Sequence, residues 1–356
     1  MAFLERILEP PSYGWKDQHG ELVQPTSAQL WREFSGRLNV LADRKNWLAL
    51  TCWGWVFCLA PFAVLFFTHF FSFPLLMVGF LYAVVAMGTH GTIWYHRYCT
   101  HRAYTFSHPF WRFVTRNLTI KAIPEEIYVV SHHVHHAMPE QPGDPYNALA
   151  GGLYCFLADA NHQPIARTLS EKDYARVTRF LDHTGVHINS YAQYQRWGSV
   201  CHPGWTMLHW VLNWGFWFSV FTAIGGLGLA VAMFGGAFVW AIGVRTFNYD
   251  GHGQGKDKRR DGVDFNRRDL SINQYWSGIV AGEWHNNHHL YPNSARSGFL
   301  PHQIDFAWLY IRTLYRFGAV SSYKDSRDSF MEKHYLPYIA EQEGEGAASI
   351  ERKATR

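Results

Sequence analysis

Two short segments, far apart in the chain, repeat one arrangement of histidines. The first reads HHVHH at 132–136 and the second HNNHH at 285–289, so both have the spacing HxxHH. On an α-helix, positions i, i+3 and i+4 fall on one face within an arc of about 100°. Neutral imidazole binds zinc, copper, iron and nickel. Each segment therefore predicts a helical face that holds metal, with these candidate ligands: His132, His135, His136, His285, His288 and His289.

Three further histidines extend this set. His96 and His101 are the first and last histidines of YHRYCTH, and His252 ends the stretch NYDGH. Nine imidazoles exceed the four ligands of zinc and the six of an octahedral ion. The natural number of ions is therefore two, and the ligand type alone does not name the metal.

Four side chains beside these segments are candidates to orient the ligand imidazoles through hydrogen bonds. Three are the carboxylates Asp144, Asp250 and Glu283, of which Asp144 in GDPYN is equally suited to forming a turn. The fourth is His133, which lies about 100° around the helix from His132 and off the centre of the predicted face. We therefore expect His133 to support the site at most, without binding metal.

The elements that must position these residues are predicted to cross a membrane. Residues 46–96 and 197–244 contain no Asp, Glu, Lys or Arg. Each run is about twice the roughly 20 residues that span a bilayer as a helix. Pro and Gly interrupt helices, and the runs are broken by FSFP at 71–74 and by GGLG at 225–228. The sequence predicts an all-α integral membrane fold with four transmembrane helices in two hairpins, at about 47–70, 74–96, 204–223 and 227–247.

Composition agrees with a lipid setting. The chain has 26 Phe, 19 Tyr and 16 Trp, and Tyr and Trp favour membrane interfaces. Uncharged runs of this length are rare in soluble cores, which disfavours the alternative of two buried hairpins in a soluble protein. A net charge of +4 without a long basic run gives no expectation of a nucleic-acid partner. The five cysteines form no CxxC pair, which favours a reducing compartment over a disulfide framework.

The positions of the cations predict the orientation. Four crossings return the chain to the side it left, so both termini and the segment between the hairpins share one face. All 32 Lys and Arg lie on that face, which the positive-inside rule makes cytoplasmic. All four histidine segments lie there too. For location we expect the bacterial inner membrane in preference to the endoplasmic reticulum.

The predicted organisation follows from these spans. An N-terminal cytoplasmic segment, 1–45, precedes the main domain, 46–310, in which a helical cytoplasmic cap carries the metal site. A C-terminal helical segment and a disordered tail, small, polar and charged, complete the chain. The cap is formed by 97–203 and 248–310, the helical segment by 311–340 and the tail by 341–356.

These motifs resemble those of the membrane fatty-acid desaturases, specifically the acyl-CoA (stearoyl, delta-9) type with three histidine boxes. The boxes stand here as HRYCTH, as HHVHH followed by GDPYN, and as GEWHNNHHLYPNSARSG. In NYDGH, Asn248 and His252 match family positions, and the resemblance covers roughly residues 45–310. It implies a di-iron centre held by the nine histidines, with Asn248 touching one iron through water. It also implies that O2 and two electrons are used to form a cis double bond in an acyl chain.

Substrate carrier and electron donor stay open at this point. The family resemblance implies a long acyl chain carried by CoA, acyl carrier protein or a lipid. Arg97, Arg102 and Lys121 are candidates to bind its head group, although basic residues near a membrane often only contact lipid. No flavin, nicotinamide or thiolate iron motif is visible, so we expect a separate donor such as cytochrome b5, ferredoxin or rubredoxin.

Two alternative functions remain. A related di-iron lipid hydroxylase or acetylenase would carry the same motifs. A non-catalytic membrane protein that binds or transports metal is disfavoured, because transport requires polar ligands near the bilayer midplane and the nine histidines lie outside the uncharged runs or at their ends.

Overall fold

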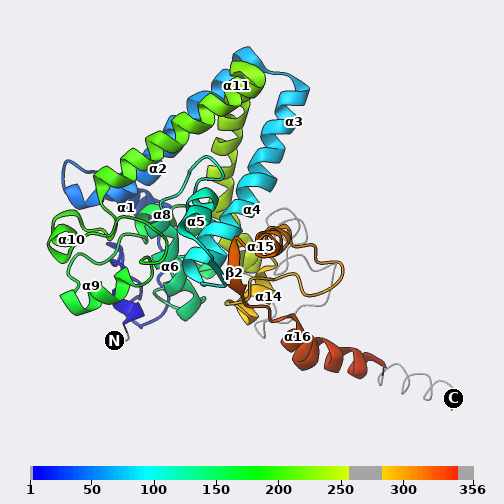
Figure 1. Cartoon of the computed structure of the whole chain (residues 1–356). Coiled ribbons are helices and arrows are strands. Elements are labelled where there is room, and N and C mark those ends of the chain that lie inside the picture. Colours follow the sequence, from blue (N-terminus) through cyan, green and yellow to red (C-terminus); the bar gives the residue numbers. More distant parts are fainter. Residues whose placement is uncertain (1–2, 256–282, 344–356) are drawn as a thin grey trace, which may run out of the picture.

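Long apolar helices project from a body of shorter helices (Figure 1). This computed structural model describes residues 3–255 and 283–343. Within those ranges, three helical stretches are long and apolar enough to cross a membrane: Arg44–Phe70, Phe73–Thr100 and Pro203–Gly251. The predicted apolar runs therefore form helices of spanning length.

The first two stretches are separated by a short break. Helix α2 (Trp47–Leu65) continues as the π-helical turn η3 (Phe66–Phe70), and α3 begins at Phe73 (Phe73–Leu81). Ser72 caps α3 by accepting a hydrogen bond from the Leu75 N–H, and proline stands in the first turn, where its missing N–H costs nothing. The FSFP sequence thus ends one helix and starts the next.

The second stretch is largely π-helical. After α3 come the π-helix η4 (Tyr82–Met87), one turn of α4 (Gly88–His90) and the π-helix η5 (Gly91–Thr100). Such widened turns are rare and are frequently found at functional sites. The first histidine segment lies on η5 and just after it.

The third stretch doubles back on itself. Helix α11 (Pro203–Gly243) would be about 60 Å long if straight, twice the thickness of a bilayer core. Gly225 and Gly226 have non-helical backbone angles, and Gly226 has a φ of 74°. The rings of Trp214 and Phe234, one on each side of this break, have centroids only 5.5 Å apart. The two halves of α11 therefore run side by side, as Figure 1 shows.

Small residues let the second half of α11 approach the second stretch closely. A Cβ atom on Gly236 would lie 2.4 Å from the carbonyl oxygen of Gly79, and one on Gly79 would lie 2.7 Å from that of Ala232. Close backbone contact through small residues is typical of helix packing in membranes. The second stretch and the second half of α11 thus form one packed pair.

The body consists of short helices packed around η5 and α6 (Glu125–Ala137). Its largest buried cluster includes Trp94, Val129 and Val130 from these two elements, together with Ile7 from the N-terminal segment. The other α-helices of the body are α1 (Ser27–Leu38), α5 (Pro109–Arg116), α7 (Gly152–Phe156), α8 (Ala158–Asn161), α9 (Glu171–Thr178), α10 (Tyr191–Trp197), α12 (Phe247–Gly251), α14 (His285–Leu290) and α15 (Phe306–Arg316).

The expectation of an all-α fold needs one correction. Strand β1 (Tyr104–Phe106) pairs antiparallel with β2 (Val320–Tyr323). This small sheet joins the residues just after the first histidine segment to the C-terminal region. The region 311–340 is therefore not wholly helical, since β2 separates α15 from α16 (Arg327–Phe330) and the π-helix η9 (Met331–Tyr335). Part of the predicted cap, 256–282, and most of the predicted tail, 344–356, lie outside the described residues.

Candidate metal centre

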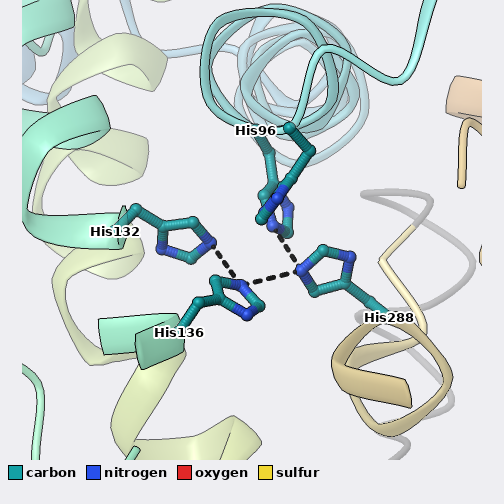
Figure 2. Close-up of side chains that lie close together, drawn as sticks. His96, His132, His136 and His288 are labelled. Atoms are coloured by element: carbon teal, nitrogen blue, oxygen red, sulfur yellow. Dashed lines mark hydrogen bonds between the residues drawn. The ribbon is translucent and has the colours of Figure 1, made fainter. Parts of the chain in front are cut away.

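The nine histidines gather into two groups. In each group the candidate ligand nitrogens all lie within 4.8 Å of one another. The five-histidine group is His96, His101, His132, His136 and His288, and the four-histidine group is His135, His252, His285 and His289. Figure 2 shows four members of the larger group pointing at one another from three elements, η5, α6 and α14.

Each HxxHH segment contributes to both groups. In α6, His132 and His136 belong to the five-histidine group, whereas His135 belongs to the other. In α14 the first and last histidines, His285 and His289, belong to the four-histidine group, whereas His288 belongs to the five-histidine group. Positions i and i+4 lie within about 40° on a helix, whereas i+3 is displaced to one side. Both helices therefore bridge the two groups by the same geometry.

The spacing inside the five-histidine group suits a shared ion. The Nε2 atoms of His96 and His288 are 2.8 Å apart, those of His288 and His136 3.0 Å, and those of His136 and His132 3.1 Å. Adjacent nitrogens bound at about 2.1 Å to one octahedral ion would lie about 3 Å apart. The imidazoles are thus gathered at the spacing of ligands.

The four-histidine group contains polar atoms that need a partner. His252 Nε2 and His135 Nε2 are 3.2 Å apart. Among the described residues, both ring nitrogens of His285 and Nε2 of His289 are buried without a hydrogen bond. Leaving such atoms unpaired costs about 1–3 kcal/mol each. A bound metal ion would satisfy one nitrogen of His285 and Nε2 of His289, so the residues present fit the ion that their chemistry implies.

Burial keeps four of the imidazoles neutral, as metal binding requires. Removal from water lowers the pKa of His132, His285, His288 and His289 well below the usual value, and the neighbouring imidazoles lower it further. Neutral imidazole has a free lone pair, so the groups are ready to bind cations near neutral pH.

Two of the predicted carboxylates contact ligand candidates. Asp144 Oδ1 lies 2.9 Å from His135 Nδ1, and Glu283 Oε2 lies 3.0 Å from His96 Nδ1. A carboxylate that accepts the Nδ1–H proton fixes the ring so that Nε2 faces the ion. The third predicted carboxylate, Asp250, accepts no hydrogen bond from a ligand histidine in the described residues. It accepts one from Gln254 Nε2 at 3.2 Å instead.

Sequence reasoning missed Glu140. Its Oε1 lies 3.2 Å from Nδ1 of His252, and its own N–H donates to Asp144 Oδ2 at 2.9 Å. Glu140 has a φ of 59°, in a turn just after α6. Its position between the second histidine box and GDPYN could have marked it as a residue near the site. Its contact with His252 depends on the fold and could not be predicted from the sequence.

His133 lies outside the two groups, and Asn248 stands beside His252 of the four-histidine group. The His133 ring stacks on Phe180, with centroids 4.2 Å apart. Burial, with the charge of Arg102, lowers the pKa of His133 to about 4. Asn248 lies on α12 one turn before His252, whose backbone N–H donates to the Asn248 carbonyl at 3.0 Å.

The predicted head-group cations mostly have other roles. Arg97 is buried and donates to Asp305 Oδ2 at 2.9 Å, to Ser297 Oγ and to the Ala295 carbonyl. Buried Lys121 pairs with Glu125 Oε1 at 2.9 Å. These two placements correct the expectation of head-group contacts, because a buried cation needs an internal counterion. Arg102 is half exposed and pairs with Asp182 at 2.9 Å.

A cavity of about 330 Å³ reaches the five-histidine group. This central cavity lies between the second apolar stretch and the end of α11, and His96 and Glu283 form part of its wall. Most of the rest is aromatic or small, including Tyr95, Tyr128 and Trp240. An apolar molecule in this cavity can therefore lie against a candidate metal ligand.

Apolar helices of spanning length that carry two buried histidine groups define the class: a membrane-type helical protein with ligands for metal ions. The sequence profile of the family described as fatty acid desaturase matches residues 77–320. The chain belongs to the fatty acid desaturase family, whose members are oxidoreductases.

Curated relatives agree with this assignment. The sn-1 stearoyl-lipid 9-desaturase of Synechocystis sp. is 24% identical over 268 residues, which are 73% of this chain and 74% of that protein. Delta-9 acyl-lipid desaturase 1 of Arabidopsis thaliana is 27% identical over 280 residues, covering 71% and 76%. A plastid relative from the same plant, named palmitoyl-monogalactosyldiacylglycerol delta-7 desaturase, is 36% identical over 113 residues, covering 28% and 29%.

Proposed function

We propose that this family member introduces a cis double bond into a long acyl chain carried by a membrane lipid, with one iron ion at each histidine group. The observation that carries the proposal is His96, which belongs to the five-histidine group and also lines the apolar central cavity. Iron, unlike zinc, has redox chemistry, and with O2 it supplies the oxidant that removes hydrogen from an unactivated methylene. For each –CH2–CH2– oxidised to –CH=CH–, one O2, two electrons and two protons give two waters.

The chain's own residues hold and shield this chemistry. Asp144, Glu283 and Glu140 accept hydrogen bonds from the outer nitrogens of three ligand candidates, which turns the inner nitrogens toward the ions. Tyr95, Tyr128 and Trp240 give the central cavity an apolar wall. Excluding water from such a site prevents side reactions of a reactive intermediate.

A second, smaller cavity extends the path for an acyl tail. It has a volume of about 80 Å³, lies between α3, η4 and the second half of α11, and shares Ala83 and Val239 with the central cavity. Apolar residues line it, among them Gly79 and Gly236, whose backbones are in close contact. A methylene chain held at His96 would extend along this interface.

The membrane arrangement is part of the proposal. Four crossings would be formed by α2 with η3, by α3 through η5, and by the two halves of α11, each close to the roughly 20 residues required. The charged body would then lie on the cytoplasmic side as a cap, with the N-terminal segment packed on it.

A lipid-linked substrate is favoured over acyl-CoA for two reasons. The relatives from Synechocystis and Arabidopsis that cover most of the chain are named as acyl-lipid desaturases. Two of the three cations first considered for a head group, Arg97 and Lys121, are occupied inside the protein. Electrons would come from a separate donor such as cytochrome b5, ferredoxin or rubredoxin.

Product analysis tests the function. Cells expressing the chain would receive a stearoyl lipid labelled with carbon-13, with a His132→Ala strain as the control, and labelled acyl chains would be examined by mass spectrometry. A product two mass units lighter, absent from the control, is expected. A product sixteen units heavier would identify a hydroxylase instead, and an unchanged acyl pool in iron-replete cells would refute the proposal.

A further inference from the structure

A separate cavity of about 260 Å³ lies away from the histidine groups. Its walls come from the end of α5, the start of α6, residues 185–187 and the first turns of α11. We call it the lateral cavity. Ile123 lines the central cavity, whereas its neighbours Pro124 and Glu125 line the lateral one, so the 123–125 segment separates the two.

Positive charge exceeds negative charge behind this cavity. Arg116 Nε and Lys121 Nζ both donate to Glu125 Oε1, at 2.7 and 2.9 Å. Burial alone would raise the pKa of Glu125, but the two cations hold it well below its usual value, so the carboxylate is ionised. Arg112 adds a third cation beside Gly185, whose carbonyl accepts a hydrogen bond from Arg116 Nη1. The Glu125 carboxylate is thus paired with two cations, and a third lies nearby beside Gly185.

Two donors in this wall are available for a ligand. Arg116 uses Nε and Nη1 within the protein, and the described residues give its Nη2 no acceptor. His209 also lines the cavity, and neither of its ring nitrogens has a hydrogen-bond partner within the described ranges.

The nearby carboxylate of Glu126 is bound to other groups and contacts none of these cations. It accepts hydrogen bonds from the N–H groups of Val200 and Cys201, both at 2.8 Å, and from the Ser199 hydroxyl. Burial raises the pKa of Glu126. Its role is to fix the backbone of residues 199–201, and Cys201 then forms part of the cavity wall.

The rim of the lateral cavity is apolar and exposed. On the first turns of α11, Trp205 is 54% and Leu212 61% exposed, and on α5 Phe113 is 61% exposed. Tryptophan favours the level of lipid head groups, and leucine favours the acyl region. A cationic interior with an apolar rim at the start of an apolar helix fits an anionic amphiphile.

We propose that the lateral cavity binds the phosphate of a membrane phospholipid. Arg116 contacts the phosphate, because guanidinium recognises phosphate oxygens through charge-assisted hydrogen bonds. The acyl chains lie along Leu208 and Leu212 on α11. This lipid is not the substrate, because the 123–125 segment separates it from the histidine groups. It braces the start of α6, the helix that carries three of the nine histidines.

Native mass spectrometry of the full chain tests the site. Protein released from detergent with phosphatidylglycerol, with neutral monogalactosyldiacylglycerol or with inorganic phosphate would be compared for the wild type, Arg116→Gln and Arg312→Gln, an exposed arginine on α15. We expect one phosphatidylglycerol retained per wild-type chain, about tenfold less in Arg116→Gln, and no loss in Arg312→Gln. The neutral lipid and free phosphate should not be retained.

A second variant covers the case in which Arg116→Gln fails to fold. Leu208→Trp keeps every cation but fills the mouth of the cavity, and it should lower phosphatidylglycerol retention to the same extent with unchanged helicity by circular dichroism. Equal retention by the wild type and a folded cavity variant would overturn the proposal. So would equal retention of the neutral lipid, or retention of inorganic phosphate in place of the phospholipid.

Discussion

His135 and Asp144 form a hydrogen bond of 2.9 Å between two fully buried side chains. Asp144 also accepts the backbone N–H groups of Glu140 and Tyr146, both at 2.9 Å. One carboxylate thus ties a ligand candidate on α6 to the turn that follows it. The GDPYN sequence is both a turn and a support for the metal centre, so the two interpretations made from sequence are compatible.

Removing the Asp144 carboxylate should weaken metal binding by the four-histidine group. We expect Asp144→Ala to lower iron affinity and desaturation by about 10–100-fold, because His135 loses the partner that fixes its ring. Iron per chain after dialysis against a chelator would measure the effect. Asp328→Ala, at a fully exposed position, is the matched control and should retain iron like the wild type.

The neighbouring histidines of α6 should differ sharply in their importance. His132→Ala should remove activity and reduce bound iron, because His132 belongs to the five-histidine group. His133→Ala should keep most of both, since that ring stacks on Phe180 instead. Metal analysis and product formation are measured on the same preparations. Comparable iron loss in both variants would show that the assignment of His133 is wrong.

The central cavity can be filled without a backbone clash. Gly243 lines it, and a Cβ atom there would meet nothing within 4 Å. We expect Gly243→Leu to reduce desaturation of a stearoyl chain by about tenfold or more, or about 1.4 kcal/mol in kcat/KM, while iron content stays unchanged. Gly215→Leu, on the same helix and also unobstructed, is the control. Unaltered kinetics in Gly243→Leu would place the acyl chain elsewhere.

His162 gives the fold a measurable pH dependence. It is buried, lies 2.5 Å from the Tyr13 hydroxyl and donates from Nδ1 to the Pro145 carbonyl at 3.0 Å. Burial lowers its pKa from 6.5 to about 3. Below pH 6.5 the unfolded chain therefore binds a proton that the folded chain does not, so the folded state loses stability as the pH falls toward 3.

A His162→Gln variant isolates this effect. It should be less stable than the wild type near neutral pH, because the contacts with Tyr13 and Pro145 are weakened. Below pH 6.5 the difference in the free energy of unfolding should shrink by up to about 1.4 kcal/mol per pH unit, since only the wild type carries the titrating group. Unfolding in detergent at several pH values would measure it, and a constant difference would contradict the assigned pKa.

Much of the centre was predictable because its ligands obey helix periodicity. The spacing of HxxHH identifies three residues on one face of α6, and the uncharged runs identify the helices of spanning length. The division of the ligands between two groups was not predictable. His135 points to one side of His132 and His136, but which histidines it joins depends on where the fold places α14. Long-range pairings were equally hidden. Arg97 meets Asp305, and β1 meets β2, across more than two hundred residues.

The shared use of α6 and α14 by both histidine groups has a consequence for assembly. An ion bound in one group fixes the rotation of both helices and their positions along their axes. The positions of the imidazole rings in the other group depend on the same rotation and axial positions. The entropy of ordering the helices is therefore lost once, at the first binding event. Metal uptake should be cooperative, so that chains carry two ions or none and those with a single ion are scarce.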